Sequence, residues 1–133
     1  MKIIGIDYGT KHIGTAVGDT KTGVAVKLRD LEVSSQDDAK KKLVALLGSE
    51  EAECVVFGLP QTFLFEETEM SAQIREFGVA VADAAGIRLG FMNEVLSSDL
   101  SKRMTGKEVK DHSSSAVIIL QDYLNKAVEH GQG

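Results

Sequence analysis

The sequence contains almost no cysteine, proline or tryptophan: it has one cysteine, Cys54, one proline, Pro60, and no tryptophan. One cysteine cannot form a disulfide within the chain, so a disulfide-built small protein is excluded and the fold must depend on an apolar core. Cys54 stands in the apolar run 54–57, where we interpret it as a small buried side chain rather than a nucleophile. A single reduced thiol fits a cytoplasmic protein.

Long apolar runs and an excess of positive charge are also missing. No segment approaches the length needed to cross a membrane, and Asp7 interrupts the first apolar stretch too early for the core of a signal peptide. Lysine and arginine number 15 against 20 aspartate and glutamate, which gives a net charge of −5. The molecule as a whole therefore has no field that attracts nucleic acid, and any polyanion site must be local. We expect a cytoplasmic protein without a membrane association.

The composition that remains is typical of one globular domain. The chain has 133 residues, of which 43% are hydrophobic and 26% charged. No internal repeat, low-complexity tract or linker divides it. We expect a single domain over residues 1–129 and a frayed tail over residues 130–133.

The order of the predicted elements indicates an α/β fold. Glycine-punctuated β patterns at residues 2–7, 12–18 and 23–28 predict an antiparallel three-strand meander. The later patterns predict helix at 36–47, strand at 53–57 ending in a turn at 58–60, helix at 66–85, strand at 87–92, and helices at 96–104 and 112–128. Strands joined through a helix lie parallel to the strand with which they pair. We therefore predict a mixed five-stranded sheet, the meander plus parallel strands, with helices on both faces.

Two acidic residues stand at the ends of predicted core strands. Asp7 closes the first strand, and Glu94 follows the strand at 87–92. Because the carboxyl ends of parallel strands meet at one edge of a sheet, we expect the two carboxylates to lie close together. Paired hard oxygen ligands suit Mg²⁺ or Mn²⁺, which keep water and bind substrate phosphates. Each acid also has a structural interpretation, Asp7 as a cap of the turn at 9–10 and Glu94 as a cap or surface residue of the next helix.

Four motifs along the chain carry a resemblance to a known family. They are Gly5–Gly14 followed by Ala16 and Val17, Val55–Pro60, Asn93–Ser98, and Ser115–Leu124. In this order, and with similar gaps, the sequence resembles the YqgF/RuvX family. That family has an RNase H-like fold and is described as Holliday junction resolvases or pre-16S rRNA nucleases. The resemblance covers nearly the whole chain.

The resemblance implies an acidic site of the RNase H type. Family members carry an aspartate in the first strand, a glutamate after a later strand, and an aspartate that opens the last helix. These positions fall on Asp7, Glu94 and His112, and Asp111 stands one residue before the last of them. The implied metal ligands are Asp7, Glu94 and His112, and the implied catalytic residues are these three together with Asp111. Asp111 is also a natural N-cap for the last helix.

The chain departs from the family pattern at three positions in or beside this site. Asn93 and Val95 flank Glu94 where the usual motif has an aspartate and an arginine, and His112 replaces a carboxylate. Imidazole is a better ligand for manganese than for magnesium, so His112 favours a change of metal. Loss of the site is the other interpretation of the same three residues.

Other residues lie close to the predicted site in the sequence. Lys11 in the first turn, and Lys102 and Arg103 before the last helix, are candidate substrate-binding residues, although a solvated polar loop accounts for them equally well. Phe63 and Phe65 follow Pro60, where the family usually continues with a polar loop. They either pack under the long helix or form an exposed patch.

The resemblance implies a divalent-metal-dependent endonuclease, a hydrolase that acts on structured nucleic acid. The expected reactions are 5′-end processing of pre-16S rRNA, which is favoured, and Holliday junction resolution, for which a homodimer would be required to cut two strands. One alternative is a catalytically eroded nucleic-acid-binding protein that has kept the fold. Another is an actin-like sugar kinase or chaperone ATPase, whose first phosphate loop Gly5–Thr10 also resembles. The chain is short for that fold, which needs two such domains.

Overall fold

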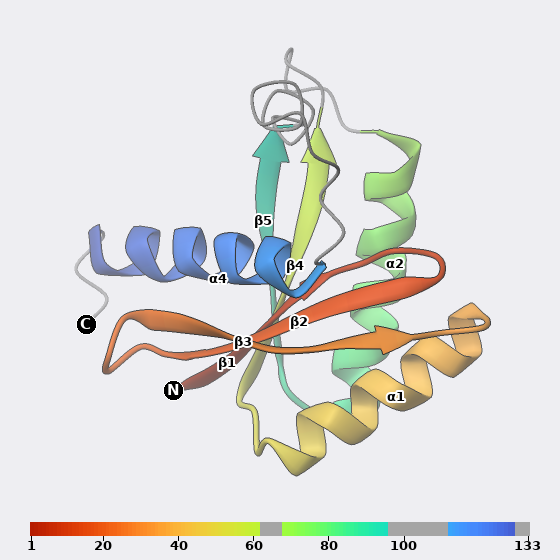
Figure 1. Ribbon diagram of the computed structural model, residues 1–133, viewed down its shortest axis with the longest axis horizontal. Helices are drawn as coiled ribbons and strands as arrows, with labels where there is room; N and C mark the ends of the chain where they lie inside the picture. Colours follow the sequence, from red (N-terminus) through yellow and green to blue (C-terminus); the bar gives the residue numbers. More distant parts are fainter. Residues whose placement is uncertain (62–67, 96–111, 130–133) are drawn as a thin grey trace.

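The computed structural model describes residues 1–61, 68–95 and 112–129. They form a five-stranded sheet in the order β3-β2-β1-β4-β5, with α1 and α2 on one face and α4 on the other (Figure 1). The predicted mixed sheet with helices on both faces is confirmed. Within the described ranges, no helix has the length and apolar character needed to cross a membrane.

The first three strands form the predicted meander. β1 (Lys2–Asp7) pairs antiparallel with β2 (His12–Asp19), which pairs antiparallel with β3 (Val24–Glu32). β3 extends beyond the predicted end at residue 28, because a register shift opposite Thr15 allows the ladder to continue. The buried Thr15 hydroxyl donates to the carbonyl of Arg29 at 2.6 Å and accepts from its N–H at 3.1 Å, so the irregular stretch keeps its hydrogen bonds.

The two remaining strands run parallel to β1, and both are longer than predicted. β4 (Cys54–Gln61) pairs with β1 and with β5 (Arg88–Val95). The segment Gly58–Pro60 lies inside β4 and not in a turn, and Glu94 lies inside β5 and does not follow it. Both local predictions were wrong because Gly58–Gln61 pair residue by residue with Met92–Val95.

The helices begin and end with recognisable caps. The side chain of Ser35 caps α1 (Gln36–Ser49), and that of Thr68 caps α2 (Glu69–Ala85). α2 ends at Gly86, whose φ of 70° places it in the left-handed region that favours glycine. α4 spans His112–Glu129, and the helix predicted at 96–104 and the predicted tail at 130–133 lie outside the described residues.

Alternating strand residues supply two cores, one on each face of the sheet. Ile4, Ile6 and Phe57 pack with α1 and α2, whereas Ile3 and Val56 pack with α4. A Cβ built on Gly5 would lie 2.7 Å from Cβ of Leu120 and 3.1 Å from the carbonyl oxygen of Ala116. The backbone of α4 therefore lies directly on β1, at a distance that only glycine allows.

Candidate functional site

Asp7 is the last residue of β1, and its side chain is half-buried. It pairs with Gly14 of β2, and it stands one residue past the pair Ile6 and Phe57 between β1 and β4. Its level in the sheet is therefore that of Gly58 in β4. By strand alternation Asp7 shares the face of Ile3 and Gly5, the face that α4 covers.

Glu94 occupies the corresponding end of β5. Its backbone pairs with Pro60, and it stands two residues past Met92, the partner of Gly58. Met92 is buried against α4, so the position of Glu94 is on the α4 face as well. Asp7 and Glu94 are thus separated by two strand spacings, about 10 Å, across the sheet and by two residues, about 7 Å, along it.

The direction of α4 brings its first residue to the same end of the sheet. Leu124 and Leu120 contact Gly18, which pairs with Ile3, and Leu120 and Ala116 contact Gly5. The helix therefore runs antiparallel to β1. Its N-terminus, at His112, lies toward the carboxyl end of β1, where the positive end of the helix dipole favours carboxylates.

The positions of Asp7, Glu94 and His112 thus lie at one edge and on one face of the sheet. The backbone alone is described for Glu94 and His112. Among the described side chains, no three histidine, cysteine, aspartate or glutamate residues gather as a set of metal ligands. Asp111, Lys102, Arg103, Phe63 and Phe65 lie outside the described residues.

Two side chains of the first turn border the same edge. Lys11 is exposed, and its carbonyl accepts a hydrogen bond from the N–H of Val33 at 2.9 Å, which fixes the turn against the end of β3. His12 opens β2 on the same face as Gly14, the partner of Asp7. Its ring is 47% exposed and its Nε2 lies 4.0 Å from a carboxylate oxygen of Glu32.

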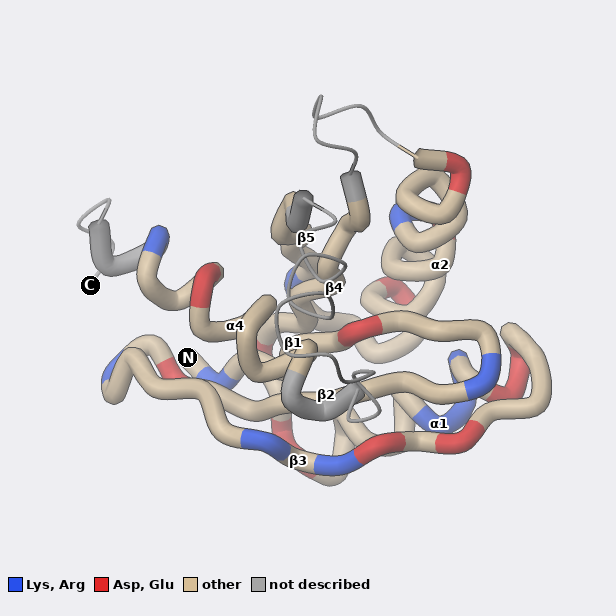
Figure 2. Tube along the Cα trace, turned by 45° about the horizontal axis from the view of Figure 1, so that its top comes forward, with Lys and Arg blue, Asp and Glu red and all other residues tan. Residues whose placement is uncertain are grey.

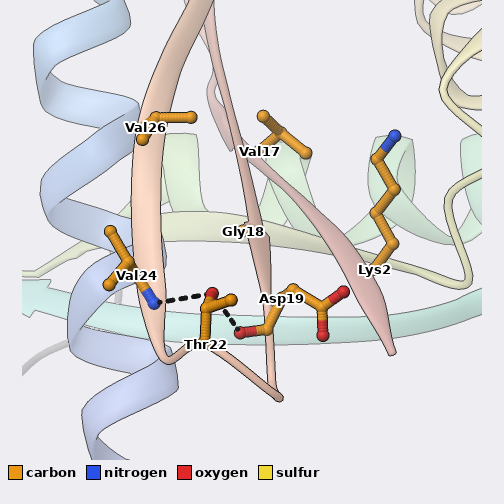
Figure 3. Close-up of a pocket in the computed structure, with 7 residues that line it drawn as sticks. All are labelled: Lys2, Val17, Gly18, Asp19, Thr22, Val24 and Val26. Atoms are coloured by element: carbon orange, nitrogen blue, oxygen red, sulfur yellow. Dashed lines mark hydrogen bonds between the residues drawn. The ribbon is translucent and has the colours of Figure 1, made fainter.

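A groove lies at the opposite end of the sheet and is not part of this site. Figure 3 shows its lining, where Val17, Val24 and Val26 stand beside Lys2 and Asp19. Lys2 begins β1 and Asp19 ends β2, so the groove is separated from Asp7 by the length of β1. Its lining is mostly apolar and holds no pair of carboxylates that could bind a metal ion.

Charge on the described surface is mixed in sign. Along β3, two basic residues, Lys27 and Arg29, are followed by two acidic ones, Asp30 and Glu32 (Figure 2). Along β3, such interspersed charge gives no continuous basic track.

Cys54 is no candidate nucleophile. Its side chain is 2% exposed in the core under α4, and burial raises the pKa of its thiol to about 11. Nucleophilic cysteines need a lowered pKa and access to solvent, and Cys54 has neither. Burial likewise raises the pKa of the neighbouring Tyr123. The interpretation of Cys54 as a core residue is confirmed.

Sequence reasoning missed two hydroxyl groups beside the site. Thr68 and Ser71 both donate to the carbonyl of Pro60, the register partner of Glu94. Ser71 is fully buried in the apolar stripe of α2. A serine within an apolar stripe indicates only that its hydroxyl needs a hydrogen-bond partner. The sequence does not show which residue that partner is.

Comparison with known proteins gives relatives over nearly the whole length of the chain. The model of the RuvX family, described as Holliday junction resolvase, matches residues 1–126. A protein of Nitratidesulfovibrio vulgaris named "Putative pre-16S rRNA nuclease" is 34% identical over an alignment of 133 positions, which covers 94% of this chain and 94% of that protein. A protein of Lawsonia intracellularis with the same name is 33% identical over an alignment of 136 positions, which covers 96% of this chain and 95% of that one.

Solved structures share the fold. RuvC of Thermus thermophilus, in complex with a Holliday junction substrate, matches with a TM-score of 0.57 and 19% identity over 96% of both chains. The Holliday junction resolvase of fowlpox virus matches with a TM-score of 0.57 and 13% identity over 95% of this chain and 99% of that one. At these identities the likeness bears on the fold, and the RNase H-like architecture is confirmed.

Proposed function

Because the chain belongs to the RuvX family of Holliday junction resolvases, we propose that it hydrolyses phosphodiester bonds in structured nucleic acid with the help of a divalent metal ion. The observation that carries this proposal is the convergence of Asp7, Glu94 and the start of α4 at one edge and face of the sheet. The names of its relatives favour pre-16S rRNA over branched DNA as the substrate, and we propose 5′-end processing as the reaction. If branched DNA is the substrate, two copies of the chain would act together, because two strands are cut.

The residues at this edge fit a small divalent ion. Asp7 is a half-buried carboxylate at the end of an apolar strand, and such a group is most stable beside a cation. Asp7, Glu94 and His112 would hold the ion, with Asp111 next to His112. Oxygen ligands suit Mg²⁺ and Mn²⁺, and an imidazole ligand favours Mn²⁺. When bound, such an ion makes water a stronger nucleophile and neutralises charge on the leaving oxygen.

The chain itself supplies the placement of the reacting groups. In the proposed site, β1 and β5 would hold Asp7 and Glu94 on strands fixed by their neighbours, and the N-terminus of α4 would stabilise negative charge beside them. Lys11, exposed in the first turn at the same edge, would contact a substrate phosphate. We assign the same role to Lys102 and Arg103.

The first test is cleavage of a structured RNA and of a four-way DNA junction in Mg²⁺ and in Mn²⁺. Asp7→Asn keeps the size of the side chain but removes its charge, so we expect cleavage to fall by about 100-fold or more. The measurement is the single-turnover rate at saturating enzyme.

Asp83→Asn is the matched control. Asp83 is exposed in the last turn of α2, away from the carboxyl ends of the strands, and its replacement should leave the rate unchanged. Equal rates for the wild type and Asp7→Asn would contradict the proposal. Cleavage of the RNA but not of the junction would identify RNA as the substrate.

The alternative is a nucleic-acid-binding protein whose site has eroded, and it is favoured by Asn93, Val95 and His112. Calorimetry with Mn²⁺ separates the two functions. The metal-dependent nuclease should bind Mn²⁺, and Glu94→Gln should weaken binding by about tenfold or more because a charged ligand is lost. Binding of structured RNA without Mn²⁺ binding or turnover would favour the eroded protein.

A further inference from the structure

The last residues of β4 have a neighbouring strand on one side only. The pairing of β1 with β4 ends at Ile6 and Phe57, whereas the pairing of β4 with β5 continues to Gln61 and Val95. Backbone groups that face away from β5 along this stretch need partners from elsewhere.

The start of α2 provides these partners. The hydroxyl of Thr68 donates to the carbonyl of Pro60 at 3.3 Å, and the hydroxyl of Ser71 donates to the same carbonyl. The two hydroxyl oxygens lie 3.2 Å apart, and Thr68 also accepts from the N–H of Ser71 at 3.1 Å as the cap of α2. These hydroxyls thus occupy the side of β4 that β1 occupies earlier in the strand.

Because Ser71 is buried, its hydrogen bond to Pro60 matters for stability. Among the residues whose side chains are described, Ser71 and Thr15 are the buried polar ones, and both are 0% exposed. A buried hydroxyl destabilises a fold unless it forms a hydrogen bond. Its neighbours Ile74 and Phe77 on the inner face of α2 are apolar, so the bond to Pro60 compensates its burial.

The carbonyl of Pro60, to which the two hydroxyls donate, lies at the level of Glu94, the candidate metal ligand. Pro60 pairs with Glu94 in the parallel ladder. Proline has no N–H and its carbonyl is bound by α2, so the ladder at this level depends on the flanking residues Leu59 and Gln61. A rotation of the Pro60 peptide would move both flanking residues, and with them the backbone of Glu94.

We propose that Ser71, supported by Thr68, is a positioning residue for Glu94, because the two hydroxyls replace a neighbouring strand along the end of β4. Ser71 does not touch the metal ion or the substrate. It acts through Pro60 and the β4–β5 ladder. The role assigned to Glu94 rests on the proposed function, whereas the effect of Ser71 on the end of β5 does not.

The test compares Ser71→Ala with Ser35→Ala. Ser35 caps α1 as Thr68 caps α2, accepting from the N–H of Asp38 at 3.0 Å, so its loss destabilises a helix away from β4. We expect Ser71→Ala to weaken Mn²⁺ binding about tenfold and to speed amide exchange over residues 88–95. The cleavage rate of Ser71→Ala should recover at saturating Mn²⁺. Ser35→Ala should match the wild type in Mn²⁺ affinity and in exchange over 88–95.

The outcomes separate this inference from the proposed function. Wild-type exchange over residues 88–95 in Ser71→Ala would overturn the positioning role, and so would wild-type Mn²⁺ affinity. A wild-type protein that binds no Mn²⁺ would contradict the proposed function instead. In that case, amide exchange over residues 88–95 in Ser71→Ala would alone decide whether Ser71 positions the end of β5.

Discussion

Cys54 shows at the scale of one residue how burial controls chemistry. The thiol lies in the core under α4, and removal from water raises its pKa from 9.0 to about 11. The native state therefore holds the thiol proton more tightly than the unfolded state does. This contribution to stability is complete below pH 9 and is lost as the pH rises from 9 to about 11.

Two measurements check this prediction. At pH 8 the native protein should react with a thiol reagent about 100-fold more slowly than the protein unfolded in denaturant. The free energy of unfolding of the wild type should fall between pH 9 and pH 11 more steeply than that of Cys54→Ala. Equal thiol reactivity in native and unfolded protein would show that Cys54 is accessible.

Single residues differ in how far the sequence alone identifies their role. Asp7 was singled out because a carboxylate at the end of an apolar strand is costly unless a cation, a basic side chain or backbone donors compensate it, and its role stays a prediction. Ser71 could not be singled out, because its partner Pro60 is eleven residues away on another element. The choice between His112 and Asp111 stays a prediction, since Asp111 lies outside the described residues.

At the scale of elements, the contact between α4 and β1 decides whether the site can form. Gly5→Ala would place a methyl group 2.7 Å from Cβ of Leu120 and 3.1 Å from the carbonyl oxygen of Ala116. Neither atom is the end of a flexible side chain, so the helix must move. We expect destabilisation of about 1–3 kcal/mol and, because His112 moves away from Asp7, weaker Mn²⁺ binding by the folded protein.

Denaturant unfolding and calorimetry measure these two effects. Gly48→Ala is the control: Gly48 lies in α1 with no atom within 4 Å of an added Cβ, so the change should stabilise the helix by about 0.5–1 kcal/mol. A Gly5→Ala protein with wild-type stability would show that α4 can shift on β1 without cost.

The ends of elements were the least predictable part of the fold. Gly58 and Pro60 have low strand propensity, yet both lie in β4 because β5 pairs with them. Within α2, the apolar residues Met70 and Ala84 are exposed, whereas the polar Ser71 is buried, so residue type alone does not give the inner face of the helix. Local sequence patterns indicate the average environment of a residue. The ends of helices and strands depend on pairing and hydrogen bonds between residues that are far apart in the sequence.

At the scale of the whole molecule, the mixed sheet was predicted mainly from the order in which helices connect the strands. A strand reached through a helix must lie parallel to its partner, so the mixed sheet followed from element order. The strand order β3-β2-β1-β4-β5 did not follow from it. The same reasoning predicted that Asp7 and Glu94 stand at one edge. It could not give the offset of two residues between them, because that depends on the register of two ladders.

The position of α4 against β1 also sets when the proposed nuclease can become active during protein synthesis. Asp7 belongs to the first strand, and His112 opens a helix that follows all five strands in the chain. A nascent chain on the ribosome holds the carboxylate of Asp7 long before α4 has emerged to cover Gly5. If Asp7, Glu94 and His112 hold the metal ion as proposed, their set is incomplete until then, and the growing polypeptide would not yet cut nucleic acid.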